Sequence, residues 1–325
     1  MIDADDLALL AVSFSAAMAQ APGAGAADVA LHELGWGELL VAAPLQGAAA
    51  AFAALGTTGS SACLLDDVLA HALGLAVTPD VCVVMPAPSR REPPGVRVGS
   101  SIHVDGLVSA RIDTSAHVVF AVADDGGQVE LVEIDAGMLG CGEGERALDP
   151  DRPYRRVAAD LAPDGVRVVS AAAEWDDAVR DARAALTHQL IAVSRVMLEL
   201  ARQHAVDREQ FGRAVASFQA VRHKLAEALV AIEGAEAVAR ASVEDDCDPL
   251  VATVAKSLAG AAARLTATNA QQVLAGIGFT TDHPFHRSLK RMMVIDTLFG
   301  SARTLPTEIG HTLLSRGGAP RLVEL

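Results

Sequence analysis

Residues 204–223 combine side chains that suit the binding of a phosphate attached to a planar ring. Arg208 offers a planar cation, Gln210 an amide and Phe211 an aromatic face. Gly212 then permits a tight turn, because glycine has no side chain to hinder the backbone. The alternative is an ordinary corner between two helices, in which Arg208 pairs with an acid and Phe211 lies in the core.

The composition limits what this stretch can bind. The chain has 325 residues, enough for two or three units with their own cores, and aromatic residues make up only 3% of it. Its 26 Lys and Arg against 41 Asp and Glu give a net charge of −15, which argues against a nucleic-acid partner. An anionic cofactor must therefore be held by a few well-placed arginines and backbone N–H groups.

Compartment and membrane signals point to a cytoplasmic protein. The start, MIDADDLALL, is acidic and lacks the basic residues of a signal peptide. The apolar region 39–55 contains Pro44, Gln46 and Gly47, so we do not expect a membrane span. The cysteines show no metal-ligand spacing and are expected to be free thiols: Cys63, Cys82, Cys141 and Cys247. We expect no metal site.

The elements that must position residues 204–223 fall into three parts. Residues 1–76 have helical patterns, at Asp3–Gln20, 27–36, 46–55 and 61–73. Residues 77–171 are rich in β-branched residues and predict a small antiparallel β domain, with a hairpin turn at 124–127.

Residues 172–325 have apolar seams at helical spacing and predict a bundle of four long antiparallel helices. The third helix is expected at 250–274, and the fourth at about 285–314 with a polar kink near 304–306. The predicted fold class is α+β, mainly α: an N-terminal helical domain, a central antiparallel β domain and a C-terminal four-helix bundle.

Two motifs at the predicted helix junctions resemble those of the acyl-CoA dehydrogenase family. Residues 208–212, REQFG, followed by Phe218-Gln219, resemble the family's R-x-x-F-G with a downstream F-Q. Residues 272–279, QVLAGIGF, resemble its Q-x-x-G-G-x-G-F, with Ala275 in place of the first glycine. The resemblance is clearest over residues 176–317.

The resemblance implies FAD as cofactor, with the two motifs coming from opposite subunits of a dimer and holding the ADP half. Arg208 and Gln210 would contact the diphosphate, and Phe211 would pack near the adenosine. Gly276 would permit close approach of the cofactor to the backbone. The implied cofactor-binding residues are Arg208, Gln210, Phe211, Gly212, Phe218, Gln219, Gln272 and Gly276.

The catalytic base of the family is missing. A glutamate takes the substrate's Cα proton in these enzymes, and its two usual places fall here on Phe299 and Ala182. Neither side chain accepts a proton. Asp181 and Asp296 lie nearby, but we expect them to be paired or solvated rather than to act as bases.

The β domain also departs from the family. In place of the family's flavin-lining T-E-x-x-x-G-S-D-like loop, this chain has PAPSRREPPG at 86–95. The chain therefore resembles a shortened, non-catalytic subunit of a heteromeric enzyme, as in actinobacterial steroid catabolism. A full-length acyl-CoA dehydrogenase subunit would supply the glutamate in an α2β2 heterotetramer acting on a bulky acyl-CoA.

Two alternatives stay open. The first alternative is a self-sufficient homodimeric dehydrogenase with a displaced base. The second is a non-enzymatic scaffold of the same ancestry. We expect the lone chain to be unstable, because a bundle face built for a partner leaves an apolar patch. The other candidate ligand residues are expected to be mainly structural or solvated: His103, His117, His188, His283, His286, Arg90 and Arg91.

Overall fold

The structure, a computed structural model, describes residues 4–140, 149, 154–244 and 247–318. Cys141 and the loop residues 245–246 therefore lie outside the described residues, as does Asp3 at the expected start of the first helix. Five helices open the chain: α1 (Ala4–Gln20), α2 (Ala24–Glu33), α3 (Trp36–Ala42), α4 (Pro44–Thr58) and α5 (Leu64–Ala72). The expected helical patterns are all present, and α3 is an additional helix that the sequence did not indicate.

Eight strands follow, with two short 3₁₀ turns between them. They are β1 (Cys82–Val83), β2 (Met85–Pro86), β3 (Gly95–Val98), β4 (Ser101–Val108), β5 (His117–Ala123), β6 (Val129–Asp135), β7 (Arg155–Leu161) and β8 (Arg167–Ser170). The hairpin turn expected at 124–127 joins β5 and β6, and the Asp124 carboxylate accepts the N–H groups of Gly126 and Gln128.

The sheet is mixed rather than purely antiparallel as expected. Its order is β2-β4-β3-β5-β6-β8, with β7 added on β4 and β1 on β5. Both β1 and β3 run parallel to β5, while the other pairs are antiparallel. The parallel pairs arise because β1 and β3 are not joined to β5 by tight hairpins, so local turn chemistry does not set their direction.

The last part is a helical bundle around the 33-residue helix α6 (Trp175–Asp207). The other helices are α7 (Gln219–Ala241), α8 (Pro249–Leu274), α9 (Phe285–Thr297) and α10 (Leu305–Arg316). The expected single fourth helix is therefore two helices, and this expectation was wrong. Phe299 and Gly300, between α9 and α10, have φ of 56° and 99°, which a right-handed helix does not allow.

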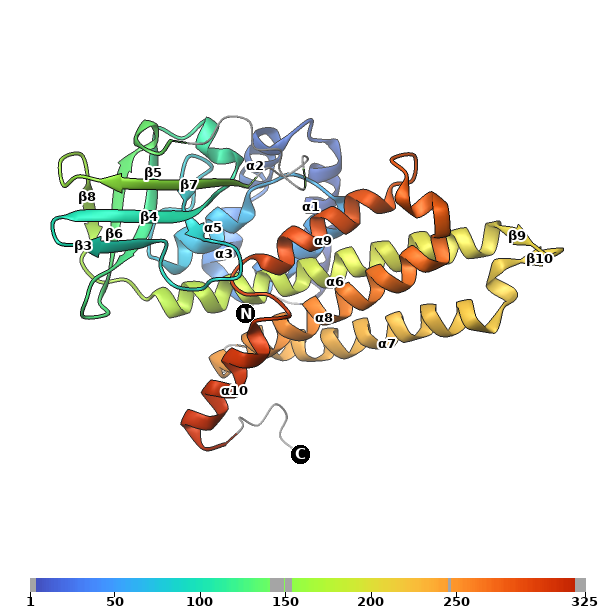
Figure 1. Cartoon of the computed structure of the whole chain (residues 1–325). Coiled ribbons are helices and arrows are strands. Elements are labelled where there is room, and N and C mark those ends of the chain that lie inside the picture. Colours follow the sequence, from blue (N-terminus) through green and yellow to red (C-terminus); the bar gives the residue numbers. More distant parts are fainter. Residues whose placement is uncertain (1–3, 141–148, 150–153, 245–246, 319–325) are drawn as a thin grey trace.

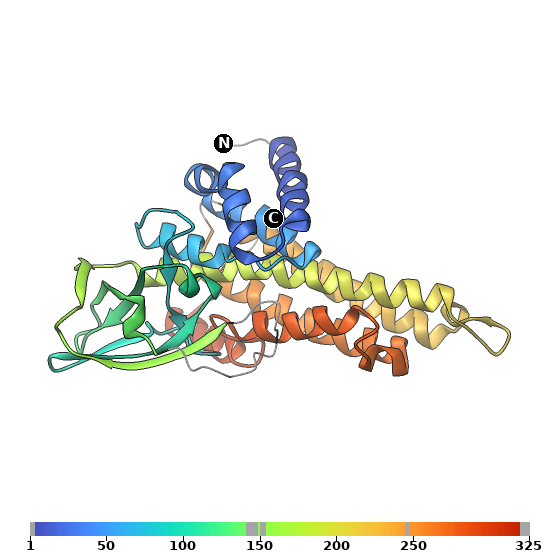
Figure 2. The same ribbon diagram turned by 90° about the horizontal axis from the view of Figure 1, so that it is seen from above.

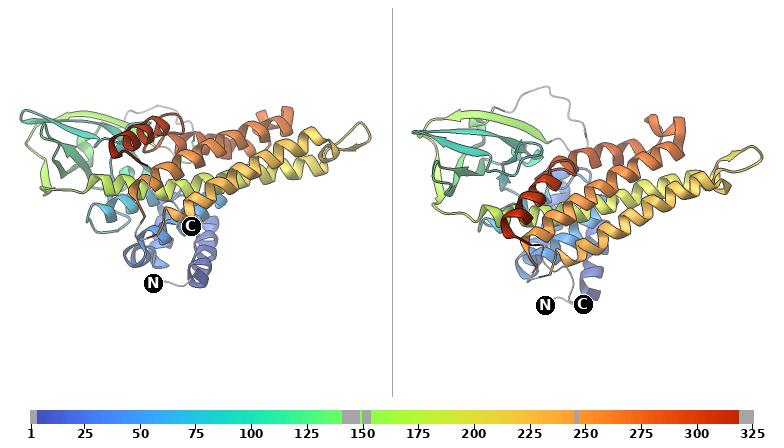
Figure 3. Two further views of the ribbon diagram at one scale, coloured as in Figure 1. Left: turned by 90° about the horizontal axis from the view of Figure 1, so that it is seen from below. Right: turned by 60° about the horizontal axis from the view of Figure 1, so that its bottom comes forward.

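Helix α6 lies in the middle of the molecule (Figures 1 and 2). The N-terminal helices cover one side of it, and α8 and α9 lie on the other. Packing is close because small residues face one another: a Cβ at Gly56 of α4 would lie 2.7 Å from the Cβ of Ala192 on α6. The β domain sits at one end of α6, and the bundle extends away from it toward the opposite tip (Figure 3).

A buried ionic network joins the N-terminal helices to the β domain. Arg111 donates to both carboxylate oxygens of Asp67 at 2.6 and 2.8 Å, and to Asp28 at 3.0 Å. Trp36 donates to Asp67 at 2.9 Å, and Asp66 accepts the backbone N–H of Val83 at 2.9 Å. Two carboxylates, those of Asp28 and Asp67, thus pair with one guanidinium, and a third buried carboxylate, that of Asp66, lies in the same network, which therefore holds an excess of acid. None of the described helices has the length and apolar character needed to cross a membrane.

Candidate functional site

The first motif forms a short hairpin at the tip of the bundle (Figure 1). Helix α6 ends where Arg208 becomes extended, at φ −84° and ψ 123°, with its N–H still donating to the carbonyl of His204 at 2.9 Å. Strands β9 (Glu209–Gln210) and β10 (Arg213–Ala214) then pair antiparallel before the 3₁₀ turn η3 (Val215–Ser217). The sequence indicated a helix corner here but not a hairpin.

Phe211 and Gly212 form the two-residue turn of this hairpin. Their φ values are 53° and 74°, and a type I′ turn needs positive φ at both positions. Gly212 adopts this conformation without strain, whereas Phe211 does so at a cost. The turn leaves the Phe211 side chain 91% exposed.

This geometry excludes the ordinary corner considered from the sequence alone. Phe211 is in solvent, not in the core, and its ring lies at 79° to the half-buried Phe218 ring with 6.2 Å between the centroids. The guanidinium of Arg208 has no hydrogen bond or ion pair within the described part of the chain. The hairpin therefore presents an aromatic ring and an unpaired cation to solvent.

The second motif lies at the end of α8. Gln272 is exposed in its last turn, and Ala275 then takes φ 52° and ψ −133°, a conformation suited to glycine. The 3₁₀ turn η4 (Ala275–Phe279) follows, with Gly276 exposed. A Cβ at Gly276 would meet no atom within 4 Å, so packing among the described residues does not require glycine there.

A groove of about 710 Å³ runs beside the second motif. Gln272, Ala275, Phe279, Met292 and Met293 are among its lining residues, and the Phe279 side chain is 80% exposed.

The two motifs lie at the same end of the bundle. The imidazole rings of His204, in the last turn of α6, and His283, between η4 and α9, are 6.5 Å apart. Burial and then the neighbouring His283 lower the pKa of His204. His283 itself accepts the N–H of Phe285 at 3.2 Å, and its carbonyl contacts His286 at 2.8 Å, so both histidines shape the start of α9.

Both places expected for a catalytic glutamate are sealed in the core. Ala182 and Phe299 are buried, and the Phe299 ring lies 6.4 Å from that of Trp175. The Phe299 carbonyl accepts the Nε–H of Arg183 at 2.9 Å, and both Arg183 Nη atoms donate to Glu308 at 2.8 Å. Glu308 was not singled out from the sequence because it lies 125 residues from Arg183 along the chain.

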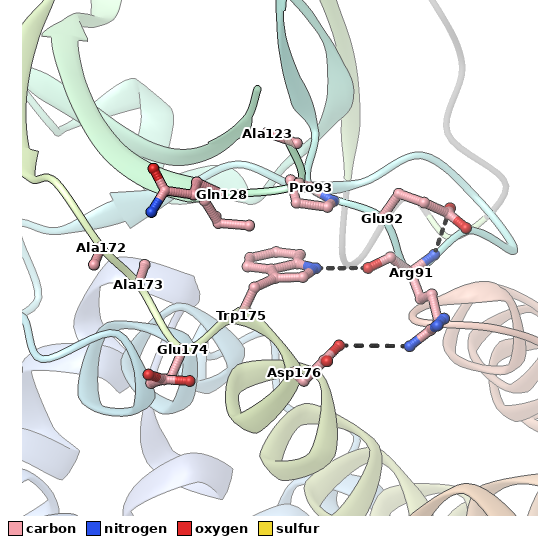
Figure 4. Close-up of a pocket in the computed structure, with 12 residues that line it drawn as sticks. Arg91, Glu92, Pro93, Ala123, Gln128, Ala172, Ala173, Glu174, Trp175 and Asp176 are labelled. Carbon is pink, nitrogen blue, oxygen red and sulfur yellow. Dashed lines mark hydrogen bonds and ion pairs between the residues drawn. The ribbon is translucent and has the colours of Figure 1, made fainter. Parts of the chain in front are cut away.

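The segment 86–95 packs over the start of α6. The Trp175 indole donates to the carbonyl of Arg91 at 2.7 Å, in a pocket of about 500 Å³ (Figure 4). Figure 4 shows Arg91 turned toward Asp176, 3.5 Å away, and its Nε also lies 3.6 Å from Glu308. Arg90 is exposed. Arg91 is therefore engaged with two acids of this chain.

The two aspartates considered as displaced bases are paired. Asp181 accepts from Arg180 at 2.8 Å, and its pKa is raised by burial. Asp296 is fully buried and accepts from Arg264 at 2.9 Å and from the Ala302 N–H at 3.0 Å.

Lys256, which the sequence analysis missed, is fully buried beside the turn between α9 and α10. It donates to the carbonyls of Ile295, Asp296 and Gly300 at 3.1–3.3 Å, and burial lowers its pKa to about 7.

The other three histidines considered in the sequence analysis have a local partner or a buried setting. His103 contacts Asp160 at 2.8 Å on the surface of the sheet, and His117 lies 4.0 Å from Glu133. Burial lowers the pKa of His188 to about 4, so this ring is neutral at pH 7. Cys63 and Cys82 are buried, and Cys247 is partly buried.

Helices, a small sheet and a long helical bundle, in this order, form the fold of the acyl-CoA dehydrogenases, a family of FAD-dependent flavoproteins. Residues 176–314 match the family model for the acyl-CoA dehydrogenase C-terminal domain. The family model therefore assigns residues 176–314 to an acyl-CoA dehydrogenase C-terminal domain, in agreement with the resemblance of the two motifs.

Relatives agree with this placement. The chain is 33% identical over 223 residues to acyl-CoA dehydrogenase FadE34 of Mycobacterium tuberculosis, a match covering 64% of this chain and 30% of that protein. The solved Tcur3481-Tcur3483 steroid ACAD G363A variant is similar at TM-score 0.74 and 21% identity, over 96% of this chain and 98% of that one. The ChsE4-ChsE5 complex from M. tuberculosis is similar at TM-score 0.73 and 18% identity, over 99% of each chain.

The exposed residues fit one half of FAD better than the other. Arg208 and Gln210 offer exposed donors for a diphosphate, and Phe211 offers an exposed ring for the adenosine. The open space at Gly276 leaves its backbone accessible. At the end of α6 near the β domain, Phe299 and Trp175 fill the place expected for the catalytic glutamate.

Proposed function

We propose that this chain is the non-catalytic subunit of a heteromeric, FAD-dependent acyl-CoA dehydrogenase. A full-length acyl-CoA dehydrogenase subunit would supply the catalytic glutamate, and this chain would complete the ADP side of the FAD site. The observation that carries the proposal is the contrast between a buried Phe299 at the base position and an exposed Phe211 at the bundle tip. The proposed domains are 1–76, 77–171 and 172–325.

The reaction removes a proton from Cα and a hydride from Cβ of an acyl-CoA. When bound, FAD supplies the acceptor for that hydride. Phe299 and Ala182 provide no proton acceptor, so this chain would contribute binding rather than proton transfer. Arg208 and Gln210 would donate to diphosphate oxygens and Phe211 would pack against the adenosine, with Gly212 and Gln219 alongside. Gln272 and Gly276 would approach the ADP half from across the interface.

The substrate we propose is a bulky, steroid-derived acyl-CoA, and the assembly an α2β2 heterotetramer. Support comes from two structural neighbours, one named as a steroid ACAD and one as a complex of two proteins. The exposed Phe211 and Phe279 rings and the groove beside α8 supply apolar surface for a partner subunit. The same surface leads us to expect poor stability of the lone chain.

The test is the flavin spectrum and sedimentation of the chain purified alone and co-expressed with a full-length acyl-CoA dehydrogenase partner. We expect a colourless or insoluble lone chain and a yellow heteromer. Arg208→Ala should empty the heteromer of flavin, whereas Arg167→Ala, on exposed β8 beside Glu133, should not. Flavin and acyl-CoA oxidation by the lone chain would refute the proposal in favour of a homodimeric enzyme. Absence of flavin from both preparations would favour a scaffold.

A further inference from the structure

The β9–β10 hairpin carries its donor side chains on one face. Gln210 and Arg213 are direct cross-strand partners, and Arg208 lies two residues before Gln210 on extended backbone. The pairing continues beyond the strands, because the Val215 N–H donates to the Arg208 carbonyl at 2.8 Å. Since side chains alternate along a strand and partners share a face, Arg208, Gln210 and Arg213 project to the same side.

Arg213 is held in place by an aromatic ring rather than by an acid. Its guanidinium carbon lies 4.1 Å from the centroid of the Phe218 ring, a cation–π contact that fixes its orientation. The Phe218 ring in turn forms a T-shaped contact with the Phe211 ring. Arg213 is exposed and has no hydrogen bond or ion pair within the described part of the chain, so its N–H donors are available.

The local charge contrasts with that of the whole chain. Residues 208–224 contain four Lys and Arg residues and one acid, Glu209, in a chain of net charge −15. Glu209 pairs with Ala214, so it projects from the opposite face of the hairpin. The face that carries the two arginines is therefore free of carboxylates from the hairpin itself.

We propose that Arg213 is a second diphosphate-binding arginine, acting beside Arg208, and that Phe218 supports Arg213 rather than contacting the ligand itself. A diphosphate has two anionic groups, and two guanidinium forks on one face match them better than one. The inference rests on the proposed function, because that function supplies the dinucleotide. It adds a binding residue that the two motifs did not indicate, and it assigns Phe218 a positioning role.

The experiment uses the co-expressed heteromer and measures its dissociation constant for FAD by flavin fluorescence. Arg213→Gln and Arg208→Gln should each weaken FAD binding by about tenfold to a hundredfold, as expected for loss of a charge-assisted hydrogen bond. Phe218→Leu keeps every donor but removes the support, so a smaller loss is expected. The matched control is Arg222→Gln, which removes a nearby cation whose Nε donates to the Ala216 carbonyl. It should change the dissociation constant by less than about threefold, a bound set by screening at physiological salt.

A second readout isolates the diphosphate. ADP should compete with FAD for the wild-type heteromer, and Arg213→Gln should weaken ADP by the same factor as FAD. Loss of flavin from Arg208→Gln but not from Arg213→Gln would overturn this inference and leave the proposed function intact. An equal loss of FAD affinity from Arg222→Gln would show that the effect comes from the overall positive charge of this region, and it would also overturn the inference. If the Arg213→Gln heteromer dissociates while the complexes that remain assembled keep their flavin, Arg213 contacts the partner subunit rather than the diphosphate, and the inference is overturned.

Discussion

Replacing Asp66 by asparagine is expected to stabilise the chain at pH 7.5. Asp66 is fully buried at the junction of α5 and β1, and burial raises its pKa to about 7 although Arg111 opposes the shift. Its Oδ1 accepts the Val83 N–H at 2.9 Å, while its Oδ2 is buried with no hydrogen-bond partner among the described residues. Asparagine can keep the first contact and carries no charge to bury.

The magnitude follows from proton linkage. A carboxyl group whose pKa is raised by folding contributes stability that is complete below its unfolded pKa, 3.8, and lost as the pH rises through the folded value of about 7. Between pH 5 and 7.5 this loss is about 2.5 kcal/mol at ~1.4 kcal/mol per pH unit. An asparagine side chain does not titrate and has no such loss, so the advantage of Asp66→Asn should grow by about that amount across the window.

The wild-type profile alone would hide this effect. The pKa of His188 is lowered to about 4, so its contribution is present above its unfolded pKa of 6.5 and is lost as the pH falls toward 4. That slope has the opposite sign over much of the same window. The difference between variant and wild type cancels His188 and isolates Asp66.

The assay is urea unfolding of the chain at several pH values, followed by tryptophan fluorescence. Trp36 donates to Asp67 in the same network and so reports on it directly. Asp125→Asn, in the exposed turn between β5 and β6, is the matched control and should show no growing difference. A difference between Asp66→Asn and wild type that stays constant with pH, or a variant destabilised at pH 7.5, would show that Asp66 is ionised and stabilised by Arg111.

Three further substitutions test the turns around the site by urea unfolding. Ala275→Gly should raise the free energy of unfolding by about 1 kcal/mol, because φ is 52° there; Gly276→Ala is the control, and no gain over it would contradict the strain argument. Lys256→Met should lower the free energy of unfolding by about 3 kcal/mol by removing the buried Nζ donor to the carbonyls of Ile295, Asp296 and Gly300. The difference in stability between wild type and Lys256→Met should widen above pH 7. Because burial lowers the pKa of Lys256 from 10.5 to about 7, the stability that its neutral form contributes grows between pH 7 and 10.5. A difference that narrows over this range would contradict the prediction. Phe299→Glu should lower stability by about 3 kcal/mol and leave the lone chain unable to bleach flavin with acyl-CoA, whereas activity would show the base site to be open.

Local signals predicted much of the fold. Helix α8, which was expected at 250–274, is an example: it begins at Pro249, where the Asp248 side chain accepts the Leu250 N–H at 2.8 Å and proline suits the first helical turn. Sequence reasoning missed β7 and continued the last helix through Phe299. The first error reflects the partly exposed register of β7 on β4, and the second an αL conformation that a phenylalanine rarely adopts.

The long-range ion pairs were beyond such signals. Arg111 meets Asp28 across 83 positions and Arg183 meets Glu308 across 125, and no spacing rule connects residues so far apart. The candidate FAD residues were predicted because both motifs are contiguous in sequence. Arg213 stands beside one of these motifs and was still overlooked, since its role depends on strand register and on the Phe218 ring beneath it.

The two ends of α6 have opposite designs, and this contrast argues for a shared rather than a vestigial site. At the end near the β domain, Arg183, Glu308 and Trp175 fill and neutralise the surroundings of Phe299. A chain that had lost all ligands would be expected to cover the other end in the same way. Instead Phe211 is kept in solvent at a positive φ, a strained arrangement that packing among the described residues does not reward. The strain makes sense if Phe211 is buried by something outside this chain, which is what a cofactor at a subunit interface provides.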